Sequence, residues 1–184
     1  VNQSYQNQKK KGNAMTKIAF LGLGVMGYPM AGHLANAGYD ITVYNRTNSK
    51  AKKWISKFPG NMEDTPSKAV EDADFVMSCV GNDNDLLDIT LGDAGAFSAM
   101  KNGSIFIDHT TVSEDVTERL YQKSKCLGIS FVDAPISGGQ AGAENGVLSI
   151  MCGGDEVDYE KVEPMLKVYS KICRRIWHIA LRTF

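Results

Sequence analysis

The stretch Lys17-Ile-Ala-Phe-Leu-Gly-Leu-Gly-Val-Met-Gly27 decides the fold, because a short apolar run passes directly into a glycine-rich turn. The apolar run at residues 18–21 is uninterrupted, as expected of a strand that is covered on both faces. After the turn, Met26, Met30 and Leu34 recur every four residues, and Gly38 supplies a stop. The stretch therefore predicts a strand, a tight turn and a helix in succession.

The glycines of this turn have the spacing Gly-x-Gly-x-x-Gly. Between a strand and a helix, this spacing is typical of a dinucleotide-binding turn. The first glycine permits the tight turn, the second lets the backbone approach a pyrophosphate, and the third lets the helix pack closely on the strand. A glycine-rich turn that binds nothing is the alternative. The expected cofactor contacts in the turn are Gly22, Leu23, Gly24, Val25, Met26 and Gly27.

Apolar runs of strand length alternate with helical periods as far as residue 179. Further strands are expected at residues 41–44, 75–80, 104–108, 129–133, 147–152 and 172–179. Further helices are expected at residues 51–58, 65–72, 82–91, 112–127 and 155–169. This alternation predicts an α/β fold, a doubly wound Rossmann-type sheet that is mostly parallel with helices on both faces. It occupies residues 15–179, between a polar segment at 1–14 and a short end at 180–184.

The composition, 43% hydrophobic and 22% charged over 184 residues, fits a soluble globular protein. No apolar run approaches the roughly 20 residues that cross a bilayer, and residues 1–14 show no secretory signal. A cytoplasmic protein without a membrane partner is therefore expected, and residues 1–14 are interpreted as a disordered tail, an upstream read-through or a cloning remnant. The four cysteines lie far apart and without a CxxC pair, so no metal site is expected. A net charge of −1 makes a nucleic-acid partner unexpected.

The segment Asn45-Arg-Thr47 follows the second expected strand, about 20 residues after the first glycine, where an NAD-selective site presents an acid to the ribose. Here that acid is missing. Asn45 carries no charge to repel a 2′-phosphate, Arg46 can form charge-assisted hydrogen bonds to it, and Thr47 adds a hydroxyl. The segment therefore favours NADP over NAD. A solvated surface arginine is the alternative for Arg46.

Two later segments are Asp108-His-Thr-Thr-Val-Ser113 and Phe131-Val-Asp-Ala-Pro-Ile-Ser-Gly-Gly-Gln-Ala-Gly-Ala-Glu-Asn-Gly-Val-Leu-Ser-Ile-Met-Cys-Gly-Gly154. Together with the glycine turn, they closely resemble the β-hydroxyacid dehydrogenase family. This family includes 3-hydroxyisobutyrate dehydrogenase, tartronate semialdehyde reductase, and the glyoxylate and succinic semialdehyde reductases. The resemblance runs from about residue 17 to residue 179, and the block at 133–139 is its most specific part.

The resemblance implies an NADP-dependent oxidoreductase that transfers hydride between the nicotinamide and a small β-hydroxyacid or its semialdehyde. Ser137, Gly138 and Gly139 match the family's substrate loop, which holds the substrate carboxylate; from composition alone, a flexible hairpin connection is the alternative. Val80 and Thr111 match positions that touch the cofactor. For Thr111, a simple helix cap is the alternative.

The resemblance also implies a catalytic lysine in a GxGxxxKxxN segment that follows residues 176–179 and opens a separate all-helical domain. Here the chain reads Ala180-Leu-Arg-Thr-Phe184. No catalytic residue is therefore assigned, and the helical domain is expected to be absent through an early stop, a frameshift or fragmentation. His109 is the only histidine expected near the nicotinamide end and so the one possible substitute.

The chain alone is accordingly expected to bind NADP without rapid turnover. A non-catalytic NADP-binding module is the alternative to the enzyme. Self-association is also expected, through apolar surface that the helical domain would cover. The residues proposed for that surface are Ile176, Trp177, Ile179 and Leu181.

Overall fold

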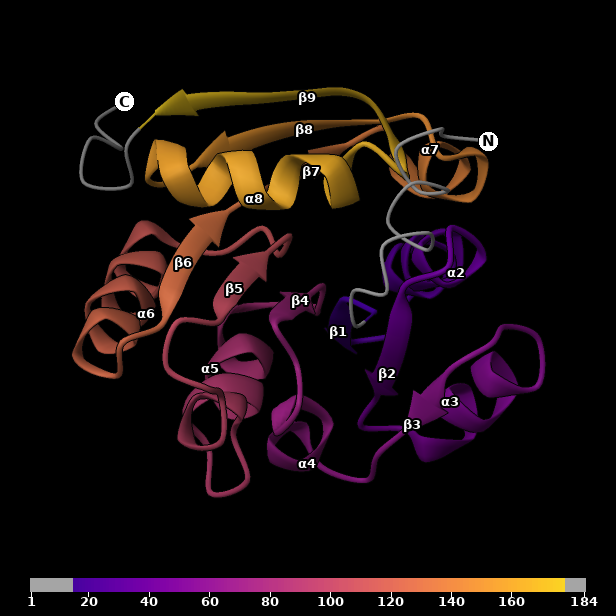
Figure 1. The fold of residues 1–184 in the computed structure, drawn as a ribbon, viewed down its shortest axis with the longest axis horizontal. Coiled ribbons are helices and arrows are strands. Elements are labelled where there is room, and N and C mark those ends of the chain that lie inside the picture. The colour runs from indigo at the N-terminus through magenta and orange to yellow at the C-terminus, as the bar shows by residue number, and fades with distance from the viewer. Residues whose placement is uncertain (1–14, 178–184) are drawn as a thin grey trace.

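The structure is a computed structural model that describes residues 15–177 (Figure 1). The expected tail at residues 1–14 and the chain end at residues 180–184 lie outside the described residues.

Six strands form the parallel part of the sheet, in the spatial order β3-β2-β1-β4-β5-β6. They are β1 (Lys17–Leu21), β2 (Asp40–Tyr44), β3 (Asn61–Met62), β4 (Phe75–Ser78), β5 (Ile105–Asp108) and β6 (Ser130–Asp133). The chain runs from β1 outward to β3, returns to the other side of β1, and continues from β4 to β6. Ligands of such sheets bind at the carboxyl ends of the strands where this reversal occurs. The predicted Rossmann-type sheet is confirmed.

Helices cover both faces of the sheet (Figure 1). One face packs against α2 (Gly27–Asn36), α3 (Asn48–Ile55) and α8 (Glu156–Leu166), and the other against α4 (Pro66–Val70), α5 (Asp83–Leu91) and α6 (Glu114–Cys126). Along β1, Ile18 and Phe20 enter the first core, whereas Ala19 and Leu21 enter the second. This burial on two sides explains why the strand is apolar without interruption.

The helix starts follow the signals in the sequence. The Thr65 hydroxyl accepts a hydrogen bond from the Lys68 amide at 3.3 Å, and Pro66 occupies the first position of α4. The side chain of Asn82 accepts a hydrogen bond from the Asp85 amide at 3.0 Å, which caps α5. Both helices begin where the sequence predicts.

The chain after β6 forms a smaller, partly antiparallel extension of the sheet. Strand β8 (Leu148–Gly153) runs antiparallel to β6 and to β7 (Ile136–Ser137), and β9 (Ser170–Trp177) lies parallel to β8. Between β7 and β8 lies α7 (Gly139–Asn145), so the alternative of a flexible hairpin connection was wrong. The strands β3 and β7 were missed because two residues are too few to show a period of alternation.

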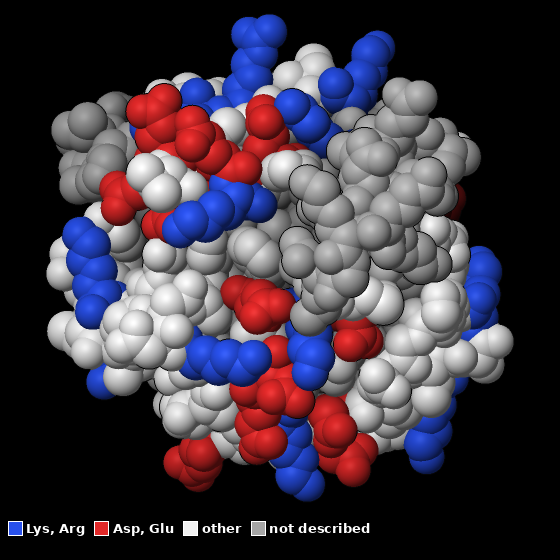
Figure 2. All heavy atoms as spheres, in the orientation of Figure 1, with Lys and Arg blue, Asp and Glu red and all other residues white. Residues whose placement is uncertain are grey.

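The surface carries both signs of charge. Figure 2 shows acidic and basic side chains interspersed over one face of the molecule.

Within β9, Ile176, one of the residues proposed for an apolar surface, is 57% exposed. Ile179 and Leu181 lie outside the described residues, and self-association stays a prediction.

Candidate functional site

The three glycines of the β1–α2 turn meet different surroundings. Gly22 has a φ of 101°, and a Cβ there would overlap the carbonyl oxygen of Cys79. A Cβ at Gly27 would overlap the carbonyl oxygen of Gly22, so both positions require glycine for the fold itself. A Cβ at Gly24 would meet nothing within 4 Å. Because the fold makes no demand on Gly24, its small size leaves room for a group from outside the chain.

The side chain of Asn45 ties this turn to the end of β2. Its Oδ1 accepts a hydrogen bond from the Leu23 amide at 2.8 Å, and its Nδ2 donates to the carbonyl of Thr47 at 3.0 Å. The Gly22 amide donates to the carbonyl of Tyr44 at 2.9 Å. Two of these hydrogen bonds join the glycine turn to the end of β2, and the third holds the Asn45 side chain in place. Asn45 was predicted as a neutral residue that tolerates a phosphate, and the structure adds this organising role.

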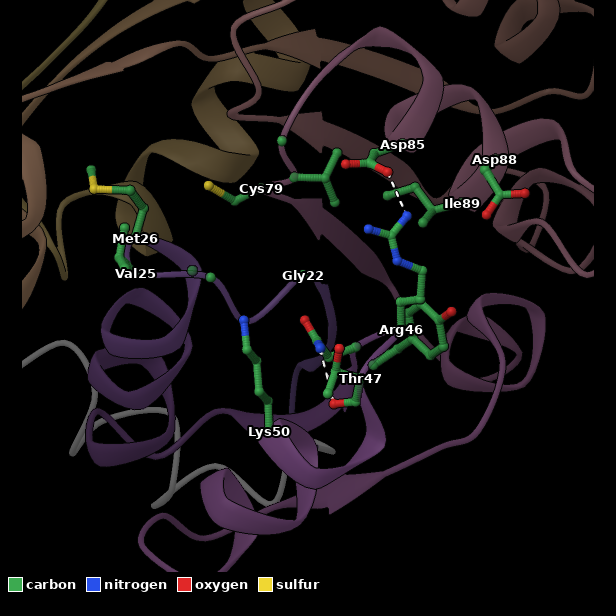
Figure 3. A pocket seen from close by; sticks show the side chains of 16 residues that line it. Gly22, Val25, Met26, Arg46, Thr47, Lys50, Cys79, Asp85, Asp88 and Ile89 are labelled. Carbon is green, nitrogen blue, oxygen red and sulfur yellow. Dashed lines mark hydrogen bonds and ion pairs between the residues drawn. The ribbon is translucent and has the colours of Figure 1, made fainter.

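A cavity of about 320 Å³ opens beside the turn, between the start of α2, the end of β2 and the start of α5 (Figure 3). Nine of the eleven predicted cofactor residues line it: Gly22, Gly24, Val25, Met26, Gly27, Asn45, Arg46, Thr47 and Val80. The other lining residues were not predicted from the sequence: Tyr44, Lys50, Cys79, Gly81, Asp85, Asp88 and Ile89. Their positions held a partial signal, since each ends a strand, follows one directly, or lies in the first turns of the helix that comes next.

Leu23 and Thr111 do not line this cavity. The Leu23 side chain is 2% exposed within the core, and its amide is engaged by Asn45. Thr111 is exposed beyond the end of β5, whereas the preceding Thr110 accepts a hydrogen bond from the Val80 amide at 3.2 Å. Thr110 therefore contacts the cavity wall through Val80, and the contact of Thr111 with the cofactor stays a prediction.

A buried network holds this wall in place. The Ser78 hydroxyl donates to Oδ1 of Asp108 at 2.7 Å, and the Thr110 amide donates to the same oxygen at 3.0 Å. Through Thr110 and Val80, the network joins the loop after β4 to the end of β5. The loop that bounds the cavity is consequently fixed to the centre of the sheet.

The charged groups of the cavity lie near the end of β2. Nη1 of Arg46 lies 2.6 Å from Oδ1 of Asp85, and Figure 3 shows the two side chains pointing toward each other from β2 and α5. Lys50 extends into the cavity from α3, and Asp88 lies on α5 one turn after Asp85.

Burial raises the pKa of the Cys79 thiol to about 12, so this side chain is a neutral group at physiological pH.

His109 is part of the core and does not face the cavity. Its Nδ1 donates to the carbonyl of Ala134 at 2.7 Å, and the Tyr169 hydroxyl donates to its Nε2 at 2.9 Å. The residue is 1% exposed, and burial lowers its pKa to about 4. A neutral ring with both nitrogens engaged does not serve a substrate, so the role of substitute proton donor was wrong for His109.

The predicted substrate residues lie at the junction of β7 and α7. Ser137 ends β7, and Gly138 and Gly139 have φ values of 131° and 61°, a region that favours glycine. All three are exposed, and none lines the cavity beside the glycine turn. The adjoining α7 is fixed to α2, because Nε2 of His33 donates to the carbonyl of Ala143 at 3.0 Å. Their contact with a substrate stays a prediction.

Within residues 15–177, no group of three or more His, Cys, Asp or Glu side chains is placed to hold a metal ion. Among the described helices, none has the length and apolar character needed to span a membrane.

Known proteins resemble this chain over most of its length. A family model for the NAD-binding domain of 6-phosphogluconate dehydrogenase matches residues 17–179. The chain is 50% identical over 157 residues to an uncharacterized oxidoreductase of Shewanella frigidimarina. The matched region covers 85% of this chain and 54% of that protein. It is 39% identical over 158 residues to a probable mitochondrial 3-hydroxyisobutyrate dehydrogenase-like protein of Arabidopsis thaliana, covering 85% of this chain and 47% of that protein.

A solved structure of Mycobacterium tuberculosis 3-hydroxyisobutyrate dehydrogenase with L-serine superposes with a TM-score of 0.84 at 27% identity. It covers 90% of this chain and 55% of that chain. The chain thus spans about half the length of the relatives it matches. From the family match and the identities together, the chain belongs to the family of the 6-phosphogluconate dehydrogenase NAD-binding domain and is related to the 3-hydroxyisobutyrate dehydrogenase-like proteins.

Proposed function

We propose that this chain binds NADP(H) in the cavity beside the glycine turn and serves an oxidoreductase that acts on a small β-hydroxyacid or its semialdehyde. The observation that carries the cofactor proposal is the pairing of Gly24 with the cations at the end of β2. Gly24 leaves open space where a pyrophosphate would lie, and Arg46 and Lys50 line the same cavity. No acid stands at residues 45–47, directly after β2, which favours a phosphate over a free ribose hydroxyl there.

Two groups of residues, at opposite ends of the cavity, are proposed to bind different parts of the cofactor. The start of α2 supplies backbone amides and the positive end of the helix dipole for the pyrophosphate. Arg46, Thr47 and Lys50 supply cations and a hydroxyl for the 2′-phosphate. When bound, the nicotinamide supplies the hydride chemistry. The loop after β4, with Val80 at the cavity wall, bounds the space for the rest of the cofactor.

The substrate proposal rests on Ser137, Gly138 and Gly139. These residues are exposed, and two consecutive glycines in the left-handed region leave backbone amides accessible to a carboxylate. The 3-hydroxyisobutyrate dehydrogenase names of two relatives agree with a small hydroxyacid. We propose a hydroxyl and amides from this segment as the chain's own contacts to the substrate carboxylate.

A purely cofactor-binding role of this chain is the second candidate, and the cavity itself favours it. Cys79, in the cavity wall, stays neutral because its pKa is raised, and His109 is buried with both ring nitrogens hydrogen-bonded. The lysine that the family resemblance implies would follow residue 179, outside the described residues. Efficient proton transfer by a positioned group contributes about 10²- to 10⁴-fold to a rate.

Cofactor choice is tested by calorimetric titration of the 184-residue chain with NADPH and NADH. We expect NADPH to bind at least about tenfold more tightly, since a charge-assisted hydrogen bond to the phosphate contributes roughly 1.5–3 kcal/mol. Arg46→Ala should weaken NADPH binding by about the same factor and NADH binding much less. Superimposable curves for the two cofactors would contradict the NADP assignment while leaving dinucleotide binding intact.

Turnover is tested by following NADPH oxidation with glyoxylate, succinic semialdehyde or tartronate semialdehyde. The enzyme role predicts reduction of one of these aldehydes by a chain extended through a GxGxxxKxxN segment, and only slow reduction by the present chain. Rapid oxidation by the present chain would show that a proton donor other than that lysine serves the reaction. Binding without turnover in both chains would favour the non-catalytic module.

A further inference from the structure

The Arg46–Asp85 ion pair crosses the end of the cavity where the adenosine ribose is proposed to lie. The two residues lie far apart in the sequence and come from the end of β2 and the first turn of α5. Their oxygen–nitrogen distance is 2.6 Å, and both side chains line the cavity. The guanidinium that is proposed to meet a 2′-phosphate is therefore already paired with a carboxylate (Figure 3).

Asp85 is the better fixed member of the pair. Its Oδ2 accepts a hydrogen bond from Nδ2 of Asn82 at 3.2 Å, and its own amide donates to Oδ1 of Asn82 at 3.0 Å. The Asp85 side chain is 23% exposed, whereas that of Arg46 is 74% exposed. A ligand that separates the pair is therefore expected to move the arginine and to leave the carboxylate in place.

The start of α5 is itself anchored to the sheet edge. Oδ2 of Asp83 accepts a hydrogen bond from the Ser113 hydroxyl at 2.6 Å, and its Oδ1 accepts one from the Ser113 amide at 3.0 Å. Ser113 caps α6, so two helices on the same face of the sheet hold each other at their first turns. This anchorage keeps Asp85 at the edge of the cavity.

We propose that Asp85 supplies, from α5, the carboxylate that is missing after β2, and that it decides cofactor choice together with Arg46. This inference rests on the proposed binding of a nicotinamide dinucleotide in the cavity. A ribose 2′-hydroxyl can donate a hydrogen bond to Asp85, as it does to the acid at the end of β2 in NAD-selective sites. A 2′-phosphate must instead draw Arg46 away while facing the negative charge of Asp85. Asp85 thus favours NAD and reduces the preference for NADP that Arg46 and Lys50 create.

The test compares Asp85→Asn with Asp88→Asn, which removes the same charge one helical turn further along the same cavity. The probes are 2′,5′-ADP and 5′-AMP, which differ only by the 2′-phosphate, together with NADPH and NADH. For Asp85→Asn we expect binding of 2′,5′-ADP and NADPH to tighten by about fivefold, the range of a partly exposed ion pair. Binding of 5′-AMP and NADH should weaken. Asp88→Asn should change the ratio between the two probes by less than about twofold.

An unchanged probe ratio in Asp85→Asn, or an equal change in both variants, would overturn the inference, because the effect would then be absent or a matter of net charge. A Gly24→Val arm separates this failure from that of the proposed function. If Gly24→Val abolishes binding and Asp85→Asn leaves the ratio unchanged, only the role of Asp85 is wrong. If the unmodified chain binds none of the four probes, the proposed function fails and the inference fails with it. Circular dichroism of each variant establishes that the fold is retained.

Discussion

Two glycine-bearing segments follow strands at the carboxyl edge of this sheet, and only one of them is enclosed. Residues 22–27 follow β1 and are surrounded by the end of β2, the loop after β4 and the start of α5, which together form a cavity. Residues 137–139 come shortly after β6 and are exposed. The difference shows that a glycine motif becomes a binding site through the elements that surround it. The elements that enclose the first segment all belong to residues 15–177. The second segment is exposed to solvent within that range.

The way each segment is fixed differs as well. The β1–α2 turn is held by backbone and side-chain hydrogen bonds to β2, among them the 2.8 Å bond from the Leu23 amide to Asn45. The chain just before the second segment is held from the core, where His109 donates to the carbonyl of Ala134 and accepts from Tyr169. We therefore expect changes in the first segment to affect binding, and changes beneath the second to affect stability.

The largest expected effect is that of Gly24→Val on cofactor binding. The new side chain would occupy the open space beside the turn, so NADPH affinity should fall by at least on the order of 100-fold, the loss of about two charge-assisted hydrogen bonds. The fold should persist, because no atom lies within 4 Å of a Cβ at this position. Calorimetry and thermal unfolding measure the two quantities.

Gly27→Val is the matched contrast, since a Cβ there would overlap the Gly22 carbonyl. It should lower the thermal midpoint and expression together. Unaltered NADPH affinity in Gly24→Val would place the phosphate site away from this turn and remove the distinction between the two segments.

The next effect is a loss of stability in acid through His109. Its folded pKa is lowered to about 4 by burial, below its ordinary value of 6.5. The stability that this neutral histidine contributes is fully present above pH 6.5 and is lost as the pH falls from 6.5 to 4. By linkage, the free energy of unfolding should fall by about 2 kcal/mol between pH 7.5 and pH 5.

Urea unfolding at the two pH values measures this change. His109→Gln should reduce the pH dependence, even if it lowers stability at both values. A pH dependence of unchanged size in that variant would assign the loss of stability in acid to titratable groups other than His109.

The smallest expected effect is that of Ser137→Ala on the cofactor. Ser137 is exposed and does not line the cavity, so NADPH affinity should stay within about twofold of the unmodified chain. Fluorescence titration with NADPH measures it, and Arg46→Ala is the positive control. A several-fold loss in Ser137→Ala would show that the two segments bind one ligand together.

Most of the parallel sheet was predictable, because β1, β2, β4 and β5 are short, mostly apolar runs that are each followed by a helix signal, and β6 is a further short run of this kind. Local patterns also placed the caps Thr65 and Asn82. The strands β3 and β7 were not predictable, since a pair of residues has no periodicity. Helix α7 begins at Gly139 and contains few apolar residues, so neither its start nor its buried face was visible.

The cavity residues that directly follow a strand were predictable from the sequence. Those that reach the cavity from a helix elsewhere in the chain were less predictable. The glycines and Asn45-Arg-Thr47 follow directly from their positions after β1 and β2. Asp85 reaches the same cavity from α5, and only the three-dimensional order of the strands brings it to Arg46. Read along the chain, Asp85 is simply an acid at a helix start.

The double engagement of Asn45 has a consequence for redesign of this protein. The usual route to an NAD-preferring enzyme places an aspartate at the end of β2, and position 45 is the obvious choice. Asn45→Asp would keep an oxygen for the Leu23 amide but would set a second oxygen against the carbonyl of Thr47, where an amide group now donates at 3.0 Å. The engineered acid would therefore loosen the turn that it was meant to serve. In this fold, a change of cofactor is better sought at Arg46, whose side chain is not part of the scaffold of the turn.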